Sequence, residues 1–109
     1  MGNTLETVIR EKRINLTNYS RLRIKAYFTT TTNDSGGAPL VGFDALGNRD
    51  SAYAASIMIT SSAQRYYDLD ISGLTGNYHL KFNVATSFGA SGFGEITKHL
   101  YITELILYP

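Results

Sequence analysis

The chain has no cysteine, no tryptophan, only two prolines and no long apolar run. Without cysteine it holds no disulfide, thiolate zinc site, iron–sulfur cluster or cysteine nucleophile. No apolar stretch reaches 18 residues, so the sequence predicts no membrane-spanning helix and no membrane partner. The net charge of +1 argues against nucleic acid as an obligatory partner, because phosphate binding needs a clear basic excess.

The residues that are abundant favour β-structure. The 8 tyrosines and 5 phenylalanines suit half-buried pleated surfaces, and the 10 glycines suit turns between strands. Helix-forming residues do not recur at a period of 3.6 over any long window. The length of 109 residues fits a single domain, which we place over 1–109.

Strict alternation of apolar and polar residues gives the clearest strand signal over 21–28. In this segment Leu22, Ile24, Ala26 and Phe28 share one face, and Arg21, Arg23, Lys25 and Tyr27 share the other. Residues 65–71 alternate in the same way, with Tyr67, Leu69 and Ile71 predicted to point inward. Residues 77–85 also alternate, with Asn77, His79, Lys81 and Asn83 expected to face water. Each pattern predicts a strand with one face on a core.

The other segments are less uniform. Residues 4–16 fit a strand better than a short helix, a short strand is predicted at 41–43, and a strand rich in small residues is predicted at 53–60. Residues 99–108 carry apolar side chains on both faces, so that strand is predicted to be central or bulged near Glu104. About six to eight strands without covering helices predict antiparallel sheets in a sandwich or barrel.

Three segments resemble a known family. They are RINLTNYSRLRIKAYF (13–28), YYDLDISGLTGNYHLKFNV (66–84) and LYITELIL (100–107), which together cover about 40% of the chain. They resemble the small jelly-roll domains of phage tail and prophage structural proteins, which are similar in outline to galactose-binding-like carbohydrate-binding modules. Asn15 stands where many such domains have Asp. We expect an early strand to be missing before residue 4, and we expect the sequence to be a C-terminal piece of a longer protein.

The resemblance implies a fold and a function. The expected fold is an antiparallel jelly-roll β-sandwich of the galactose-binding-like type. The expected function is a non-catalytic carbohydrate-binding or receptor-binding accessory domain of a phage structural protein or a secreted bacterial protein. Its partner would be a cell-surface polysaccharide, and its place the virion or the extracellular space. The alternative is a structural or oligomerisation module that contacts other tail or particle subunits or further copies of itself.

Five residues are candidates for ligand binding. Phe88 and Phe93 lie in the glycine-rich segment 86–97, which reads either as a plain hairpin loop or as a loop presenting rings to a sugar. Tyr27 and Tyr66 are predicted to share an outward face, where their rings suit sugar stacking or protein contact equally. Arg49 lies in a polar loop and is a candidate hydrogen-bond donor.

Six of the ten basic residues lie within 10–25, opposed there only by Glu11. This basic stripe reads as a solvated strand face or as a surface for an anionic glycan. The second reading predicts binding that weakens with salt.

Oxygen-bearing loop residues are the only metal candidates. Asp34, Asp44, Asn48 and Asp50 could supply carboxylate and amide oxygens to calcium, although their spacing matches no calcium motif. Solvated loop polar groups are the simpler interpretation. We expect no cofactor other than this candidate calcium.

No arrangement in the sequence indicates an enzyme. His79 and His99 have no metal-binding or nucleophilic neighbour in sequence, and no G-x-S-x-G elbow is present. Asp68 and Asp70 share one strand face, but both are expected in water, pairing across strands with the basic residues at 21, 23 and 25. We therefore predict no catalytic residue.

Overall fold

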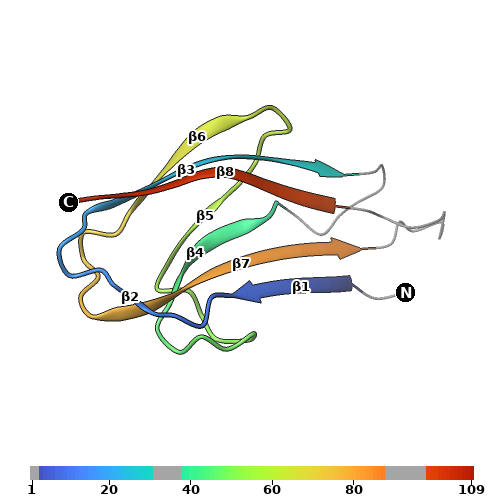
Figure 1. The fold of residues 1–109 in the computed structure, drawn as a ribbon. Coiled ribbons are helices and arrows are strands. Elements are labelled where there is room, and N and C mark those ends of the chain that lie inside the picture. Colours follow the sequence, from blue (N-terminus) through green and yellow to red (C-terminus); the bar gives the residue numbers. More distant parts are fainter. Residues whose placement is uncertain (1–2, 31–37, 88–97) are drawn as a thin grey trace.

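The structure is a computed structural model that describes residues 3–30, 38–87 and 98–109 (Figure 1). This part of the chain forms eight strands. They are β1 (Asn3–Ile9), β2 (Ile14–Asn15), β3 (Arg21–Thr30), β4 (Leu40–Asp44), β5 (Ala55–Met58), β6 (Arg65–Asp70), β7 (Asn77–Ser87) and β8 (Lys98–Tyr108). Within these ranges no helix is long and apolar enough to cross a membrane.

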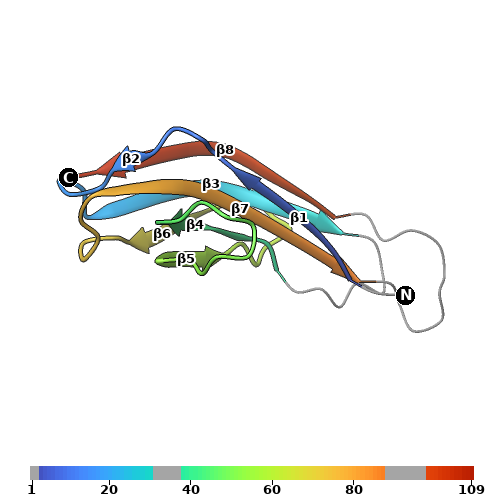
Figure 2. The ribbon, with the colours of Figure 1, turned by 90° about the horizontal axis from the view of Figure 1, so that it is seen from below.

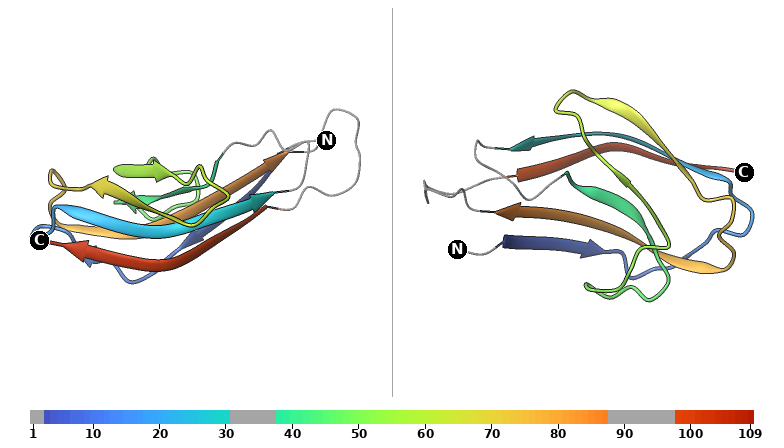
Figure 3. Two further views of the ribbon diagram at one scale, coloured as in Figure 1. Left: turned by 90° about the horizontal axis from the view of Figure 1, so that it is seen from above. Right: turned by 180° about the vertical axis from the view of Figure 1, so that it is seen from behind.

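The strands form two antiparallel sheets, which confirms the predicted all-β sandwich. The first sheet has the order β1-β7-β4-β5, with the short β2 also pairing β7. The second sheet has the order β6-β3-β8. Figures 2 and 3 show the long strands of both sheets aligned along roughly one common axis, with neighbouring strands pointing in opposite directions.

The strand pairs are nested along the chain. β4 pairs β5 and β1 pairs β7 in the first sheet, while β3 pairs β6 in the second. Successive pairs of the nested series therefore alternate between the two sheets. A long hairpin wound onto itself in this way is the arrangement of a jelly roll.

The core lies between the sheets and follows the predicted alternation. β3 contributes Leu22, Ile24 and Ala26, and β6 contributes Tyr67 and Leu69, all of them buried. From the first sheet and the connections come the other buried hydrophobics, which are Leu16, Val41, Phe43, Ile59, Ile71 and Leu80. The inward residues predicted for 65–71 are confirmed.

Residues 4–16 form two strands rather than one. The preference for strand over helix is confirmed, since β1 pairs residues 81–87 and β2 pairs residues 77–78 of the same neighbour, β7. Between them lies the charged run 10–13, which is exposed. Consecutive charged side chains cannot alternate into a core, so the pairing stops there and resumes at Ile14.

Strand β8 has the predicted irregularity but not the alternative central position. The register with β3 shifts between Lys25 and Ala26, because Glu104 opposes the former and Ile102 the latter. Thr103 is therefore an extra residue, and the bulge predicted near Glu104 is confirmed. Among the described strands β8 pairs only β3, so it forms an edge of its sheet.

Candidate functional site

The outward surface of the second sheet gathers aromatic and charged side chains from three strands. Because β3 buries its even-numbered residues through Ala26, its odd-numbered residues and their cross-strand partners point away from the core. We call this surface the outer face. Its residues are Arg21, Arg23, Lys25 and Tyr27 of β3, Tyr66, Asp68 and Asp70 of β6, and His99, Tyr101, Glu104, Ile106 and Tyr108 of β8.

Tyrosine rings lie at several points of the outer face. The rings of Tyr27 and Tyr101 are stacked, with centroids 4.7 Å apart and planes inclined by 17°. Tyr66 is 50% exposed and donates its hydroxyl to a carboxylate oxygen of Glu104 at 3.0 Å. This bond joins β6 to β8 across the intervening β3, so the Tyr66 side chain is held along the sheet surface.

Charges on the outer face alternate in sign between strands. Arg23 donates two hydrogen bonds to Asp68, at 2.9 and 3.1 Å, and Arg21 lies 3.8 Å from the same carboxylate. The register sets Arg21 opposite Asp70 and Lys25 opposite Glu104. The hydrogen bond from Arg23 holds the pKa of the Asp68 carboxyl below its ordinary value. The predicted pairing of Asp68 with the basic stripe is confirmed, and three cations here meet three carboxylates.

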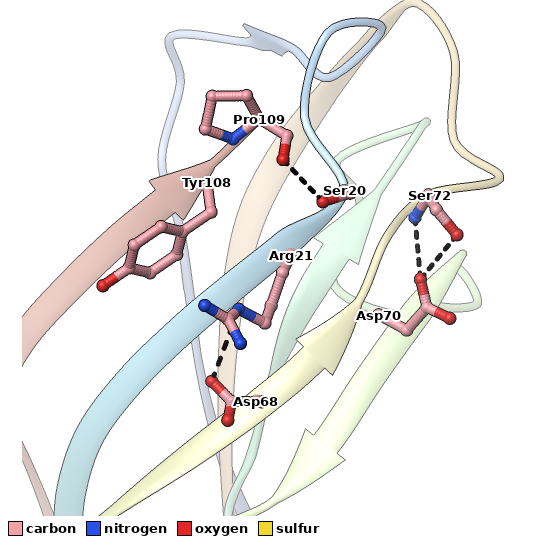
Figure 4. Close-up of a pocket in the computed structure, with 7 residues that line it drawn as sticks. All are labelled: Ser20, Arg21, Asp68, Asp70, Ser72, Tyr108 and Pro109. Atoms are coloured by element: carbon pink, nitrogen blue, oxygen red, sulfur yellow. Dashed lines mark hydrogen bonds and ion pairs between the residues drawn. The ribbon is translucent and has the colours of Figure 1, made fainter.

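One end of the outer face is hollowed (Figure 4). The open hollow has a volume of about 560 Å³, and its lining residues are Ser20, Arg21, Asp68, Asp70, Ser72, Tyr108 and Pro109. The guanidinium of Arg21 lies over the Tyr108 ring, 4.5 Å from its centroid. Asp70 accepts hydrogen bonds from the hydroxyl and backbone N–H of Ser72, and these lower the pKa of its carboxyl. Donors, acceptors and a ring therefore share one shallow recess.

Comparisons with family models, with curated proteins and with solved structures give no match for this chain.

The predicted ligand-binding residues are only partly brought together. Tyr27 and Tyr66 share the outer face, as their alternation indicated. Arg49 is exposed in the loop that joins β4 to β5, which belongs to the other sheet. Phe88 and Phe93 lie outside the described residues, as does the metal candidate Asp34.

A second cluster lies on the first sheet and is built around Lys81. The ammonium group donates to a carboxylate oxygen of Asp44 at 2.9 Å and to the backbone carbonyls of Asn48 at 2.9 Å and Ser51 at 2.7 Å. Lys81 and Asp44 are each only 1% exposed. The prediction that Lys81 faces water is wrong, because the loop between β4 and β5 folds over the outward side of its strand.

The alternation of β7 indicates that Lys81 points away from the core, but it does not indicate that the loop between β4 and β5 covers this side chain. For this reason the sequence did not reveal the cluster. Its ammonium group sits among one carboxylate and two backbone carbonyls, the kinds of oxygen that calcium also takes. Asp44 therefore already has a cationic partner, while Asp50 is exposed on the same loop. Among the described residues no group of three or more His, Asp and Glu side chains could hold a metal ion.

Tyr53 closes the Lys81 cluster on one side. The Lys81 ammonium lies 4.8 Å from the centroid of its ring, within range of a cation–π attraction. The Tyr53 hydroxyl is buried and has no hydrogen-bond partner within the described part of the chain. Burial and the negative charge of Asp44 raise the pKa of this hydroxyl to about 12. The ring, rather than the hydroxyl, is therefore the contribution of Tyr53 to the cluster.

The Lys81 cluster should make folding stability sensitive to acid. Burial alone would raise the pKa of the Asp44 carboxyl, but hydrogen bonds from Ser51, from Lys81 and from two backbone N–H groups hold it well below its usual range. A carboxyl with a lowered folded-state pKa stabilises fully above about pH 5, and the stabilisation declines as pH falls below the ordinary aspartate value of about 3.9. We expect the urea midpoint to change little between pH 7 and pH 5 and to fall steeply between pH 4 and pH 2.

The variant Asp44→Asn is the control for this acid sensitivity. It cannot titrate at this position, so its urea midpoint should be lower at pH 7 but should change less between pH 4 and pH 2. Equal pH dependence of the wild type and Asp44→Asn in this range would show that other carboxyl groups govern acid unfolding.

Proposed function

We propose that the protein is a non-catalytic glycan-binding domain whose sugar lies on the outer face of the β6-β3-β8 sheet. The observation that carries the proposal is the combination of exposed tyrosine rings with a shallow recess of donors and acceptors on one surface. Aromatic rings stack against the C–H faces of sugars. Carboxylate, guanidinium and hydroxyl groups are suited to the hydroxyls of a sugar.

In this proposal one part of the outer face stacks against the sugar and another part hydrogen-bonds to it. Tyr66 and the Tyr27–Tyr101 pair provide ring surface. The hydrogen bond to Glu104 already fixes the Tyr66 side chain in the free protein, so ordering this side chain adds little entropy cost to binding. At the hollow, Asp70 and Arg21 contact sugar hydroxyls. Binding at a single shallow site is weak, so several copies on one particle or assembly would raise the avidity.

The charge balance favours a neutral glycan. Arg23 is already paired with Asp68, and the remaining cations of the outer face lie opposite carboxylates. A sugar therefore gains little from bulk electrostatic attraction, in contrast to the anionic glycan that the basic stripe suggested. We expect binding to change little between low and moderate salt, because screening acts mainly on unpaired charges.

The carboxylates of the outer face support a binding role over catalysis. A general acid in glycoside hydrolysis needs a raised pKa to keep its proton near neutral pH. Asp68 and Asp70 both have lowered pKa values, the first through its hydrogen bond from Arg23 and the second through those from Ser72. Both carboxyl groups are therefore ionised acceptors.

The setting of the domain is proposed from the sequence resemblance alone. A cell-surface polysaccharide as ligand, and a place on a virion or outside the cell, follow from the likeness to phage tail and prophage domains. No calcium is required in this proposal, since Lys81 already neutralises Asp44. The alternative, a structural or oligomerisation module of a tail or particle, predicts stable self-association without a sugar.

The proposal is tested by binding of the wild-type domain to a broad glycan array, followed by titration of the best neutral glycan. We expect saturable binding, an affinity loss of at least about tenfold in Tyr66→Ala from the lost ring, and little loss in Tyr66→Phe. A chelator should leave binding unchanged. Loss of binding on chelation would instead indicate that the predicted calcium site takes part in binding.

Met58→Ala is the matched control, because Met58 is 57% exposed but lies on β5 of the other sheet. Its affinity should equal that of the wild type. Silence of the wild type on the array, or equal binding by Tyr66→Ala and Met58→Ala, would contradict the outer-face assignment. Far-UV circular dichroism of each variant checks that folding is retained.

A further inference from the structure

Among the described strands, β8 has a pairing partner on one side only. From the innermost pair outward the nested series is β4/β5, then β3/β6, then β1/β7, and successive pairs alternate between the two sheets. The next pair of the series belongs to the second sheet and joins β8 to a strand on its open side. None of the described strands lies there, so they leave one position of the nested series unfilled.

The packing of the two sheets sets the width of this open position. β5 lies close to β6, and β7 lies close to β8. Since the sheet orders are β1-β7-β4-β5 and β6-β3-β8, β1 lies past β8 and faces no described strand of the second sheet. Figures 1 and 3 show β1 beyond β7, on the side away from β3 and β6. This overhang is one strand wide, so it fits a single added strand, whereas a folded domain with a sheet of its own would collide with β1.

Strand β8 differs from the other edge strands in length and in charge. It has 11 residues, against 7 for β1, 4 for β5 and 6 for β6. Three residues of β6 are charged, whereas 100–103 and 105–108 of β8 carry no charge. Natural sheets protect their edges by keeping them short, charged or bulged. Apart from its bulge at Thr103, β8 has little of this protection, so its outward backbone groups are available for pairing.

Apolar side chains of β8 are left uncovered beside this edge. Leu105 lies opposite the fully buried Ile24, so it shares the core side of the sheet, yet it is 39% exposed. Leu100, Ile102 and Leu107, on the same side of β8, are only partly buried against the core. An added strand with apolar residues on its core side would complete the cover of these side chains.

The connection between β1 and β2 places positive charge beside the open position. Residues 10–13 are all exposed and hold three basic side chains against one carboxylate, a net charge of +2. None of them forms an ion pair within the described part of the chain. Figures 2 and 3 show this connection leaving the first sheet on the side where β8 lies. An open hollow of about 390 Å³ is lined by residues 9–12. A strand that enters beside β8 therefore meets unpaired cations, which favour acidic residues in it.

We propose that β8 binds an extended segment of another protein, which joins the second sheet as a fourth strand antiparallel to β8. Recognition by strand addition takes its affinity from main-chain hydrogen bonds and its specificity from alternate side chains. The segment has an apolar residue at every second position, and these residues pack beside Leu100, Ile102 and Leu105. A flexible tail or linker supplies such a segment, because it brings no folded sheet against β1.

The direction of the added strand determines where its acidic residues lie. β1 and β8 point toward the same end of the molecule in Figure 1, so the run 10–13, which follows β1, lies toward the end of β8. An antiparallel strand starts opposite that end. The first half of the segment is therefore acidic. The inference goes beyond glycan binding, because it uses the edge and the core side of β8 and none of the proposed sugar contacts.

The experiment is fluorescence anisotropy of a labelled peptide of about ten residues, in which valine alternates with acidic residues in the first half and with threonine in the second. We expect saturable binding to the wild-type chain and a dissociation constant at least about tenfold higher for Leu105→Asp. The matched control Met58→Asp, exposed on β5 of the other sheet, should bind as the wild type does. No binding by the wild type would overturn the inference.

A second peptide makes the test independent of whether Leu105→Asp folds. Its threonines are replaced by proline, which removes backbone N–H donors and blocks the ladder, so it should not bind. Equal binding of the two peptides would contradict strand addition. The labelled peptide should also slow the hydrogen exchange of backbone amides in 100–108 and leave those of β5 unchanged. If every amide in 100–108 exchanges slowly before peptide is added, the edge is already occupied and the inference fails.

A pair of charge reversals tests the placement beside the run 10–13. Arg13→Glu should weaken peptide binding several-fold at low salt, and the difference from the wild type should shrink as salt is added. Arg65→Glu is the matched control, because Arg65 is equally exposed but lies on β6, at the opposite edge of the same sheet. Equal affinities of the two variants would contradict this placement.

Discussion

Lys81→Met should lower the free energy of unfolding by about 3–5 kcal/mol, the usual cost of leaving one partner of a buried ion pair uncompensated. Methionine retains most of the length of the lysine side chain, so the loss is mainly that of the charge and its donors. Asp44 and two backbone carbonyls then have no ammonium group to satisfy them. Urea unfolding followed by circular dichroism at pH 7 measures this loss.

Two further variants separate charge from packing in the Lys81 cluster. Tyr53→Phe keeps the ring beside the ammonium and removes only a buried hydroxyl without a described partner, so its stability should stay within about 1 kcal/mol of the wild type. Asp44→Asn combined with Lys81→Met removes both charges and should be more stable than Lys81→Met alone. If Lys81→Met lowers the free energy of unfolding by less than about 1 kcal/mol, the ion pair between Lys81 and Asp44 is not formed in solution.

Gly42→Ala should destabilise the fold by about 3 kcal/mol, at the upper end of the cost of overpacking a close contact. A Cβ at residue 42 would overlap the backbone carbonyl oxygen of Ala55 and lie 2.8 Å from the Cα of Ser56. Both obstacles are backbone atoms of the paired strand β5, so no side-chain rotation relieves them. The β4–β5 ladder must shift, and thermal unfolding should report the loss as a clearly lowered melting temperature.

Gly73→Ala is the matched control for this prediction. A Cβ at residue 73 meets no described atom within 4 Å. The same chemical change should therefore alter stability by less than about 1 kcal/mol, and it can stabilise by restricting the unfolded chain. Comparable losses in Gly42→Ala and Gly73→Ala would point to backbone entropy, and not to the close approach of β4 and β5.

The sequence alone was sufficient for the strands that obey a strict two-residue period. Leu22, Ile24 and Ala26 are buried in β3 because each alternate side chain of a strand points to the same side. The same rule set Tyr27 and Tyr66 on one surface and gave Arg23 a carboxylate neighbour at Asp68. These outcomes need only local geometry and one pairing register, which hydrophobic alternation itself constrains.

What covers a strand face, and which strand ends a sheet, was decided by tertiary structure. The alternation of β7 directed Lys81 away from the core correctly, but its burial depends on a loop from β4 to β5 that is more than 25 residues away in sequence. Apolar residues on both sides of β8 suggested a central strand as much as a bulged one, and among the described strands the pairing makes it an edge. Both properties depend on contacts between distant segments, which a residue pattern along one strand does not encode.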